Sequence, residues 1–391
     1  MKLFRRLSTA RLLALVVSVV AAAAAASVGA IAAAGSSAQT PPPKRLDEAL
    51  LDALRAPQPA GITARVRFTN HLLPSGALAG TGAPQGSALL SGGSGRLWWS
   101  PDGRGRLELQ SSSGDAQILW DETKLTIWDS SSNTVYTLPL PSRRDGSTAK
   151  EAAPTLADVD ALLGRLAGHV SLGAATPVSV AGQPAYTLTV SPARPAGLLG
   201  SLALAWDATH GVPLEVALSA KGQSTPALAL TVTDIAFGPV SPSDLDVTPP
   251  ASAKTVELGA AGAGGSESRG GSKVTGLAAV QAAVPFTLVA PDTLAGRART
   301  SVRLLGGDRK AALVLYGSGP GGIVLVERAA GAATAGGPEA ALPTVDVGSE
   351  TAHELATQLG TVLFLERGDV SIVLAGSITA ADAEAAARSL G

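Results

Sequence analysis

Histidine is the residue type best suited to acid–base or metal chemistry near neutral pH, and this sequence contains few of them. The four histidines are His71, His169, His210 and His353. None has a second histidine or a carboxylate at metal-ligand spacing, and the segment HELATQ, which begins at His353, lacks the second histidine of a zinc-binding helix. His210 lies in a Thr-His-Gly segment typical of a turn. We therefore expect surface or turn histidines, with no catalytic residue and no metal site.

Other patterns that carry chemistry are also missing from the sequence. The Gly-rich segments at residues 92–96 and 317–322 match neither a P-loop nor a dinucleotide-binding fingerprint, and they indicate loops. No G-x-S-x-G segment occurs with a plausible histidine partner. The chain has no cysteine, which excludes disulfides, thiolate ligands, cysteine nucleophiles and the acylated cysteine of a bacterial lipoprotein. We expect a protein that is not an enzyme and that needs no cofactor.

Composition and charge narrow the class of partner. The chain has 391 residues, of which 46% are hydrophobic and 16% charged, so it can bury a sizeable core. Its formal net charge is −1. No block of Lys and Arg occurs beyond the N-terminus, so nucleic-acid binding is not expected. Arg143 and Arg144 are the nearest approach to a basic site; they indicate a solvated loop, or a contact for anionic head groups or for a partner.

The N-terminus carries a targeting signal. Lys2, Arg5, Arg6 and Arg11 precede an uncharged apolar run from Leu12 to Ala34, which ends among small residues. The run is long for a signal peptide and long enough to span a bilayer. Two readings stay open: a signal peptide cleaved near Ala34 or Ala38, or an anchor formed by residues 12–34. Both make the remaining chain extracytoplasmic, secreted or anchored at the outer face of the cytoplasmic membrane.

The remaining chain divides at a linker. Residues 45–256 read as one long antiparallel sheet with two amphipathic helices, at 46–54 and 156–170, whereas 74–95 reads largely as a loop. The Gly/Ser-rich residues 257–276 form a linker. Residues 277–391 predict a smaller domain with strands from 277 onward, a short helix at 349–359 and a final helix capped by Thr379. The fold class is α+β, with a curved antiparallel sheet covered by helices and a second, smaller α+β domain.

The aromatic residues lie mainly on hairpins. The segment ILWDETKLTIWDSSSNTVY at 118–136 holds Trp120, Trp128 and Tyr136 within strands that alternate apolar and polar residues. Trp98 and Trp99 are adjacent in a predicted strand, so they must face opposite sides of the sheet. These aromatics either stabilise the hairpins by packing or line an apolar pocket.

Three motifs in order resemble the LolA-like superfamily, which includes lipoprotein carriers, LppX/LprG and RseB relatives. The resemblance is strongest to exported members of actinobacterial type and covers residues 45–256. A Glu122-Thr123 pair replaces the usual Gly of the first turn. The matching residues are Asp121, Lys124, Trp128, Asp129, Asn133 and Val135 in the hairpin; Asp207, Gly211 and Pro213 in a later turn; and Asp234, Phe237, Leu245, Pro249 and Pro250 at the end.

The resemblance implies a half-barrel sheet with helices inside its concave face. It also implies that this surface binds acyl chains, lipoproteins or a membrane-protein partner, without catalysis. We expect a lipid, a lipoprotein acyl chain or another apolar ligand to lie between sheet and helices; the alternative is an RseB-like tethered sensor that binds an anti-sigma factor or another membrane protein. The residues predicted to line the site are Trp98, Leu107, Leu109, Ile118, Leu125 and Ile127 from strands and Leu162, Leu163 and Leu166 from a helix.

Overall fold

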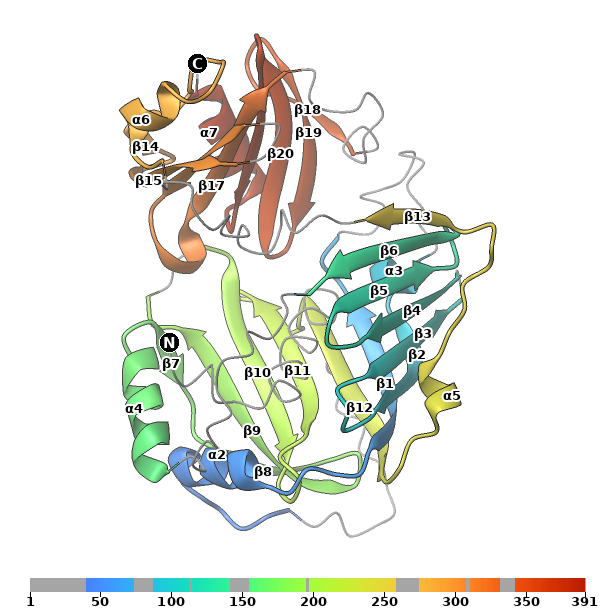
Figure 1. Cartoon of the computed structure of the whole chain (residues 1–391). Coiled ribbons are helices and arrows are strands. Elements are labelled where there is room, and N and C mark those ends of the chain that lie inside the picture. Colours follow the sequence, from blue (N-terminus) through green and yellow to red (C-terminus); the bar gives the residue numbers. More distant parts are fainter. Residues whose placement is uncertain are drawn as a thin grey trace. The chain divides into compact units, whose positions relative to one another are not determined.

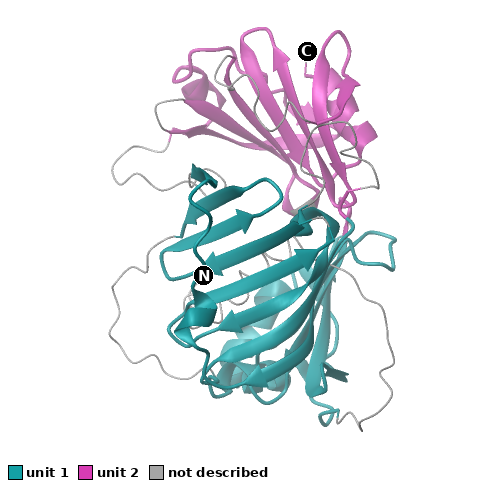
Figure 2. Cartoon of the chain, turned by 90° about the vertical axis from the view of Figure 1, so that its right-hand side faces the viewer, with its two compact units in different colours: residues 1–71, 84–194, 200–263 teal, residues 72–83, 195–199, 264–391 magenta. Residues whose placement is uncertain are grey.

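The computed structural model divides the chain into two compact units, coloured separately in Figure 2. Unit 1 comprises Met1–His71, Pro84–Arg194 and Gly200–Ala263, and unit 2 comprises Leu72–Ala83, Pro195–Leu199 and Gly264–Gly391. The structure describes residues 40–73, 87–112, 114–140, 155–194, 197–257, 274–306, 310–330 and 342–390. The predicted targeting segment at 12–34 and the arginines at 143 and 144 lie outside these ranges. Within them, no helix is both long and apolar enough to cross a bilayer.

Unit 1 is built on a 13-stranded curved sheet, which confirms the predicted α+β fold class (Figure 1). Neighbouring strands run β13-β6-β5-β4-β3-β2-β1-β12-β11-β10-β9-β7, and β8 pairs with β9. Strands β1 to β6 form an antiparallel meander, whereas β13 pairs with β6 in parallel. The strands are β1 (Ile62–Asn70), β2 (Gly93–Trp99), β3 (Gly105–Ser111), β4 (Gly114–Trp120), β5 (Lys124–Asp129), β6 (Thr134–Pro139), β7 (Val170–Leu172), β8 (Thr176–Val180), β9 (Gln183–Pro192), β10 (Leu199–Asp207), β11 (Pro213–Ala220), β12 (Leu228–Phe237) and β13 (Lys254–Glu257).

In the described part of unit 1, four helices accompany this sheet: α2 (Leu46–Arg55), α3 (Ala88–Ser91), α4 (Leu156–Leu166) and α5 (Pro242–Leu245). The Thr155 side chain and Asp158 form a capping box that begins α4. Two sequence predictions were wrong in detail. Of the loop expected at 74–95, residues 74–86 lie outside the described ranges, and the described remainder contains α3, which Ser87 caps, and the start of β2. Val170, predicted to continue the second helix, begins β7, where it pairs with Pro192.

Alternation along the strands gives the sheet two different faces. We call the inner face the one that carries Ile62, Ala64, Val66 and Phe68 of β1, and the outer face the one that carries the intervening polar residues. Ala88 of α3 packs into the inner-face core, so α3 covers this side. The buried members of this core are Ile62, Ala64, Val66, Phe68, Ala88, Trp99, Leu107, Leu109, Ala116, Ile118, Trp120, Leu125, Ala185, Leu214, Val232 and Ile235.

A separate apolar cluster lies where α2 meets β9 and β10. Ala49 of α2 packs with Tyr186, Leu188 and Trp206. The rings of Tyr186 and Trp206 have centroids 6.0 Å apart, and the Tyr186 hydroxyl donates to the Pro42 carbonyl at 2.7 Å. These contacts hold the segment around Pro42, which precedes α2, against the sheet.

Unit 2 is a smaller α+β domain with an 8-stranded sheet in the order β14-β15-β16-β17-β21-β20-β19-β18. Its helices are α6 (Leu277–Gln281) and α7 (Ala380–Arg388), and a 3₁₀ turn spans Gly319–Gly321. The strands are β14 (Thr293–Leu294), β15 (Arg297–Leu305), β16 (Ala311–Tyr316), β17 (Ile323–Ala329), β18 (Thr344–Asp346), β19 (Thr351–Thr357), β20 (Gly360–Arg367) and β21 (Val370–Gly376).

The predicted secondary structure is confirmed at the end of unit 2 and is wrong at two other places. Thr379 caps α7 by accepting a hydrogen bond from the Asp382 backbone, as predicted. The segment 349–359, expected to be a helix, contains β19 instead, and Ala352–Thr357 of this strand pair with β20. The strand expected from residue 277 begins as helix α6. In β19, pairing with β20 overrides a local preference for helix. In α6, the sequence LAAVQ already favours a helix locally, so the strand prediction was wrong on local grounds.

A candidate apolar binding face on the curved sheet

The structure brings most of the predicted sheet residues together on the inner face. Leu107 lies opposite Ile118, which lies opposite Ile127, so these side chains form one row across β3, β4 and β5. Leu125 pairs with Trp120 in the neighbouring row. The most deeply placed of the predicted residues is Leu109, with 0% of its surface exposed. The centre of the predicted site is therefore packed core.

Trp98 is not part of this set. It pairs with Arg106 across β2 and β3, whereas Leu97 pairs with Leu107, so Trp98 faces the outer side and Trp99 takes the inner position. The Arg106 guanidinium carbon lies 4.7 Å from the centroid of the Trp98 ring. This distance is within the range of a cation–π contact.

Hydrogen bonds hold Arg106 in place over Trp98. Arg106 donates from Nε to Gln117 at 2.9 Å, from Nη2 to Glu108 at 2.6 Å and from Nη1 to the Asp244 carbonyl at 3.1 Å. The last of these bonds ties α5 to the outer face. The arrangement binds parts of the same chain together and leaves Trp98 covered, so Trp98 serves the scaffold.

The three leucines predicted on the helix lie apart from the inner-face core. Leu162, Leu163 and Leu166 are half-buried on α4, whose neighbour is α2. Only Val159 among the described residues of α4 is fully buried. The buried cluster on the inner face includes none of the described α4 side chains. The helix and the sheet residues of the predicted site therefore occupy different parts of unit 1.

Half-buried apolar side chains gather on the inner face along β5 and β6. We call Ile127, Tyr136, Leu138 and Leu140 the β5–β6 patch. Ile127 lies opposite Tyr136, and Leu138 lies opposite the buried Leu125. Ile127, Leu138 and Leu140 pack against the buried core from its margin. The patch is thus continuous with the core on one side and partly open to solvent on the other.

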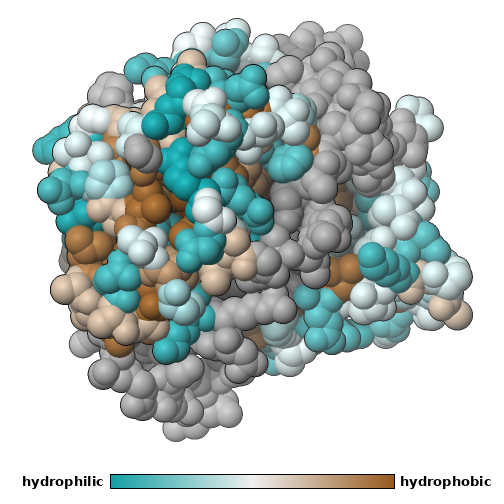
Figure 3. All heavy atoms as spheres, turned by 90° about the horizontal axis from the view of Figure 1, so that it is seen from above, coloured by the Kyte–Doolittle hydropathy of each residue, from teal (hydrophilic) through white to brown (hydrophobic). Residues whose placement is uncertain are grey.

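Sequence reasoning named only Ile127 of this patch. The signal for the others was present, because Tyr136, Leu138 and Leu140 alternate with polar or proline residues at a period of two. Their orientation follows only from the pairing of β6 with β5. On the face of the molecule shown in Figure 3, apolar and polar residues are interspersed, as is usual for a protein surface.

The polar residues of the first motif build the turns that position these strands. Asp121 Oδ1 accepts hydrogen bonds from the Thr123 backbone at 2.7 Å and the Lys124 backbone at 2.9 Å. Burial opposes ionisation, but the bonds from Thr123 and Lys124 outweigh it and lower the pKa of Asp121. Asp129 closes the next turn by accepting from Ser131. Asn133 adopts a left-handed φ of 46°.

One pair of residues resembles part of a catalytic arrangement. Asp207 Oδ1 lies 2.9 Å from His210 Nδ1, and the His210 ring stacks on Phe237 with centroids 3.9 Å apart. The same Asp207 oxygen accepts the backbone N–H groups of Thr209 and His210. No serine or threonine hydroxyl contacts His210 among the described residues, and these residues hold no group of three potential metal ligands. The geometry supports a turn-capping role for Asp207.

Comparisons with known proteins give only distant similarity. No protein-family model matches the chain, and no curated protein matches it. The structure of MucB in complex with MucA(peri) is 15% identical over 87% of this chain and 95% of that chain, with a TM-score of 0.39. The Pseudomonas aeruginosa MucA/MucB complex is 15% identical over 87% and 96%, with a TM-score of 0.40. An uncharacterized conserved protein from Thermus thermophilus is 12% identical over 54% and 98%, with a TM-score of 0.32. Similarity at this level assigns the chain to no family.

Proposed function

We propose that unit 1 is a non-catalytic, extracytoplasmic binding domain that holds a lipid or lipoprotein acyl chain at the β5–β6 patch. The observation that carries this proposal is the continuity of that patch with the inner-face core. An apolar ligand can contact the half-buried side chains of such a surface while the packed core beneath it stays intact. The proposed ligand therefore lies along the margin of the core, from Leu138 toward Ile127.

The placement of the LolA-like motifs supports the proposal. Asp121, Asp129 and Asn133 occupy the turns of the β4–β5–β6 meander that presents the patch. Asp207 caps the turn that leads to Pro213 and β11. These residues keep strand ends fixed, so the sheet presents its apolar surface with little loss of entropy on binding.

The energetics favour a long chain over a small apolar molecule. Each buried methylene contributes about 0.8 kcal/mol, so a chain of about fourteen carbons gains about 10 kcal/mol before the costs of association. A small hydrocarbon does not gain enough to offset those costs. A membrane-protein segment with a row of apolar side chains is the alternative occupant, and it would make the protein a tethered sensor of RseB-like type.

Brominated fatty acids test the position of the ligand, because bromine quenches tryptophan fluorescence at short range. Trp120 lies on the inner face beside Leu125, whereas Trp128 pairs with Val135 on the outer face. One variant keeps Trp120 alone and a second keeps Trp128 alone, with phenylalanine at the other four tryptophan positions. The proposal predicts saturable quenching of Trp120 and little quenching of Trp128. Equal quenching of both, or none, would contradict it.

A further inference from the structure

A short strap in unit 2 has its backbone held by side chains instead of by a helix or strand. We define the strap as Phe286–Ala290, which belongs to no regular element. Gln281 donates to the Phe286 carbonyl at 2.8 Å and accepts from the Leu288 N–H at 2.8 Å. Glu327 Oε2 accepts from the Val289 N–H at 2.7 Å, and Arg299 donates to the Ala290 carbonyl. Side chains from three different elements therefore fix its path.

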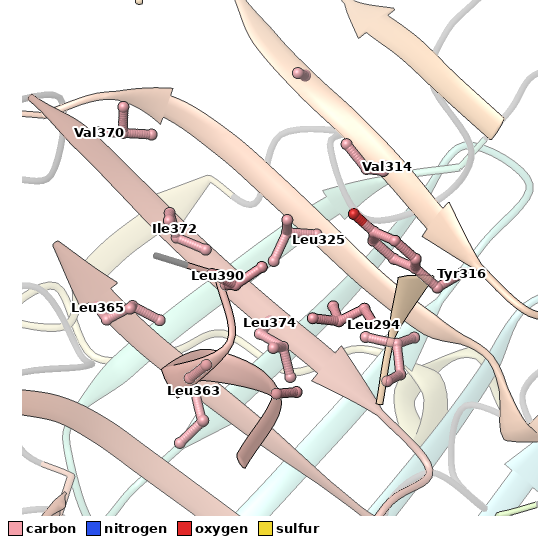
Figure 4. Packing of buried hydrophobic residues seen from close by; sticks show 14 of the residues in the cluster. Leu294, Val314, Tyr316, Leu325, Leu363, Leu365, Val370, Ile372, Leu374 and Leu390 are labelled. Carbon is pink, nitrogen blue, oxygen red and sulfur yellow. The ribbon is translucent and has the colours of Figure 1, made fainter. Parts of the chain in front are cut away.

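The strap covers the apolar core of unit 2. Phe286 is buried in that core, and Leu288, Val289 and Ala290 pack against it as partly buried residues. Figure 4 shows part of this core, with Tyr316, Leu325, Ile372 and Leu374 from three neighbouring strands. Release of the strap would expose apolar side chains of both the strap and the core beneath it.

Glu327 is an unusual residue to hold such a strap, because its side chain points into the apolar core. Its exposed fraction is 0%, and its register neighbours are Ala312 on β16 and Ile372 on β21. Oε2 has the Val289 N–H, whereas Oε1 has no hydrogen-bond partner among the described residues. A carboxylate with one hydrogen bond in an apolar site is costly to ionise.

The groups around Glu327 supply no compensating cation in the described part of unit 2. From β16, Tyr316 faces the same core; it is 1% exposed and its hydroxyl also lacks a partner, while burial raises its pKa to about 12. From β15, Arg299 is paired with Asp292 at 2.7 Å.

The helices and the remaining neighbouring strand add nothing ionic to this site. Helix α6 contains no charged residue, and β21 presents Ile372 and Leu374. On α7, Asp382 bonds Thr379, and Arg388 lies 3.4 Å from Glu384. Burial therefore dominates and raises the pKa of the Glu327 carboxyl to about 7, against the opposing effect of the Val289 hydrogen bond.

We propose that Glu327 is a proton-controlled catch that keeps the strap closed when the carboxyl is protonated and releases it as the carboxyl ionises. In the neutral form, Oε2 keeps the Val289 bond without burying a charge. In the ionised form, the charge is stabilised by water, which reaches it only when the strap lifts. The inference concerns unit 2 and is independent of the ligand proposed for unit 1.

Hydrogen exchange measured by NMR or mass spectrometry on the full chain tests the catch, with protection factors corrected for the intrinsic effect of pH. Glu327→Gln keeps an oxygen for the Val289 N–H and cannot ionise. Glu366→Gln is the matched control, because it removes an exposed carboxylate from β20 of the same sheet. We expect wild-type protection of Leu288 and Val289 to fall about 10-fold or more between about pH 5.5 and 8.5. The fall should persist in E366Q and vanish in E327Q.

Three results would overturn the proposal. The first is protection of Leu288 and Val289 in the wild type that does not change with pH. This result is read from the wild type alone and does not depend on whether a variant folds. The second is an E327Q strap that still opens as pH rises. The third is an equal loss of protection at Ile372 and Leu374 in the core strand, because opening would then be global unfolding and not release of the strap.

Discussion

Trp98 and Trp99 are adjacent in β2, and their indole rings lie on opposite faces of one sheet. Trp99 pairs with Gly105 and with Ile62, and it belongs to the inner-face core. Trp98 lies beneath the Arg106 guanidinium on the outer face, at 4.7 Å from ring centroid to guanidinium carbon. The inner ring stabilises the surface that we propose to bind ligand, and the outer ring secures the back of the sheet.

Replacing each tryptophan separates the two roles. Trp99→Ala removes a large side chain from the inner-face core and should lower the free energy of unfolding by about 3–5 kcal/mol. Trp98→Ala should weaken fatty-acid binding less than Trp99→Ala does, because it removes a ring from the face opposite the patch. Urea unfolding followed by circular dichroism gives the first quantity, and fatty-acid titration of the folded variants gives the second. Weaker acyl-chain binding in W98A at unchanged stability would contradict the assignment of faces.

Gly105 lies under the ring of Trp120. Replacing this glycine by alanine, which adds only a Cβ, should therefore change the stability of unit 1. A Cβ added at residue 105 would overlap the Trp120 ring. Gly105→Ala should therefore displace that ring and destabilise unit 1 by about 1–3 kcal/mol, with a shift in tryptophan emission. Gly238→Ala is the control, since a Cβ at that position meets nothing within 4 Å. Similar stabilities of the two variants would show that Trp120 does not pack as described.

Two leucines in the same meander offer a matched test of the ligand site. Leu138 belongs to the β5–β6 patch, and Leu119 is a half-buried residue on the outer face of β4, opposite Arg106. Leu138→Asn should weaken binding of a long-chain fatty acid by about 10-fold or more, because it removes apolar contact and adds a polar group. Titration of a fluorescent fatty acid measures this change.

The control is Leu119→Asn, which makes the same substitution at a similar burial on the opposite face. It should leave the dissociation constant within about 2-fold of wild type. If L119N weakens binding as much as L138N, the ligand does not lie on the inner face.

Glu327 links the stability of unit 2 to pH. Its folded-state pKa is raised from the ordinary 4.5 to about 7, so its contribution is fully present below about pH 4.5 and is lost as pH rises through about 7. Glu327→Gln should raise the free energy of unfolding at about pH 8 by roughly 2–3 kcal/mol and change it little near pH 4.5. Thermal unfolding at both values measures this difference. An equal effect at both would show that the carboxyl does not ionise within this range.

Much of the fold follows from local patterns. The alternation of Ile62, Ala64, Val66 and Phe68 with polar residues predicts β1 and its buried face, and the structure confirms both. The Thr379 cap was likewise readable, because a threonine followed three residues later by Asp382 satisfies the first turn of a helix. Local signals of this kind depend on near neighbours in the sequence.

The features that sequence reasoning missed depend on distant partners. Adjacent tryptophans must face opposite sides, but only the pairing of Trp98 with Arg106 decides which is inner. The residues of β19 favour a helix locally, yet pairing with β20 makes them a strand. The α4 leucines have a helical apolar stripe, and only packing shows that their helix meets α2 instead of the β3–β5 core. Glu327 shares a face of β17 with Ile323 and Leu325, and only pairing with β16 and β21 shows that this face is the buried one.

Native mass spectrometry of the full chain, purified gently from its own host and followed by organic extraction, shows whether the protein carries an acyl-chain ligand. We expect a bound species of lipid mass that carries a long acyl chain and is depleted in L138N but retained in L119N. A protein that is free of lipid in wild type, or one whose lipid content is the same in both variants, would contradict an acyl-chain site at the β5–β6 patch.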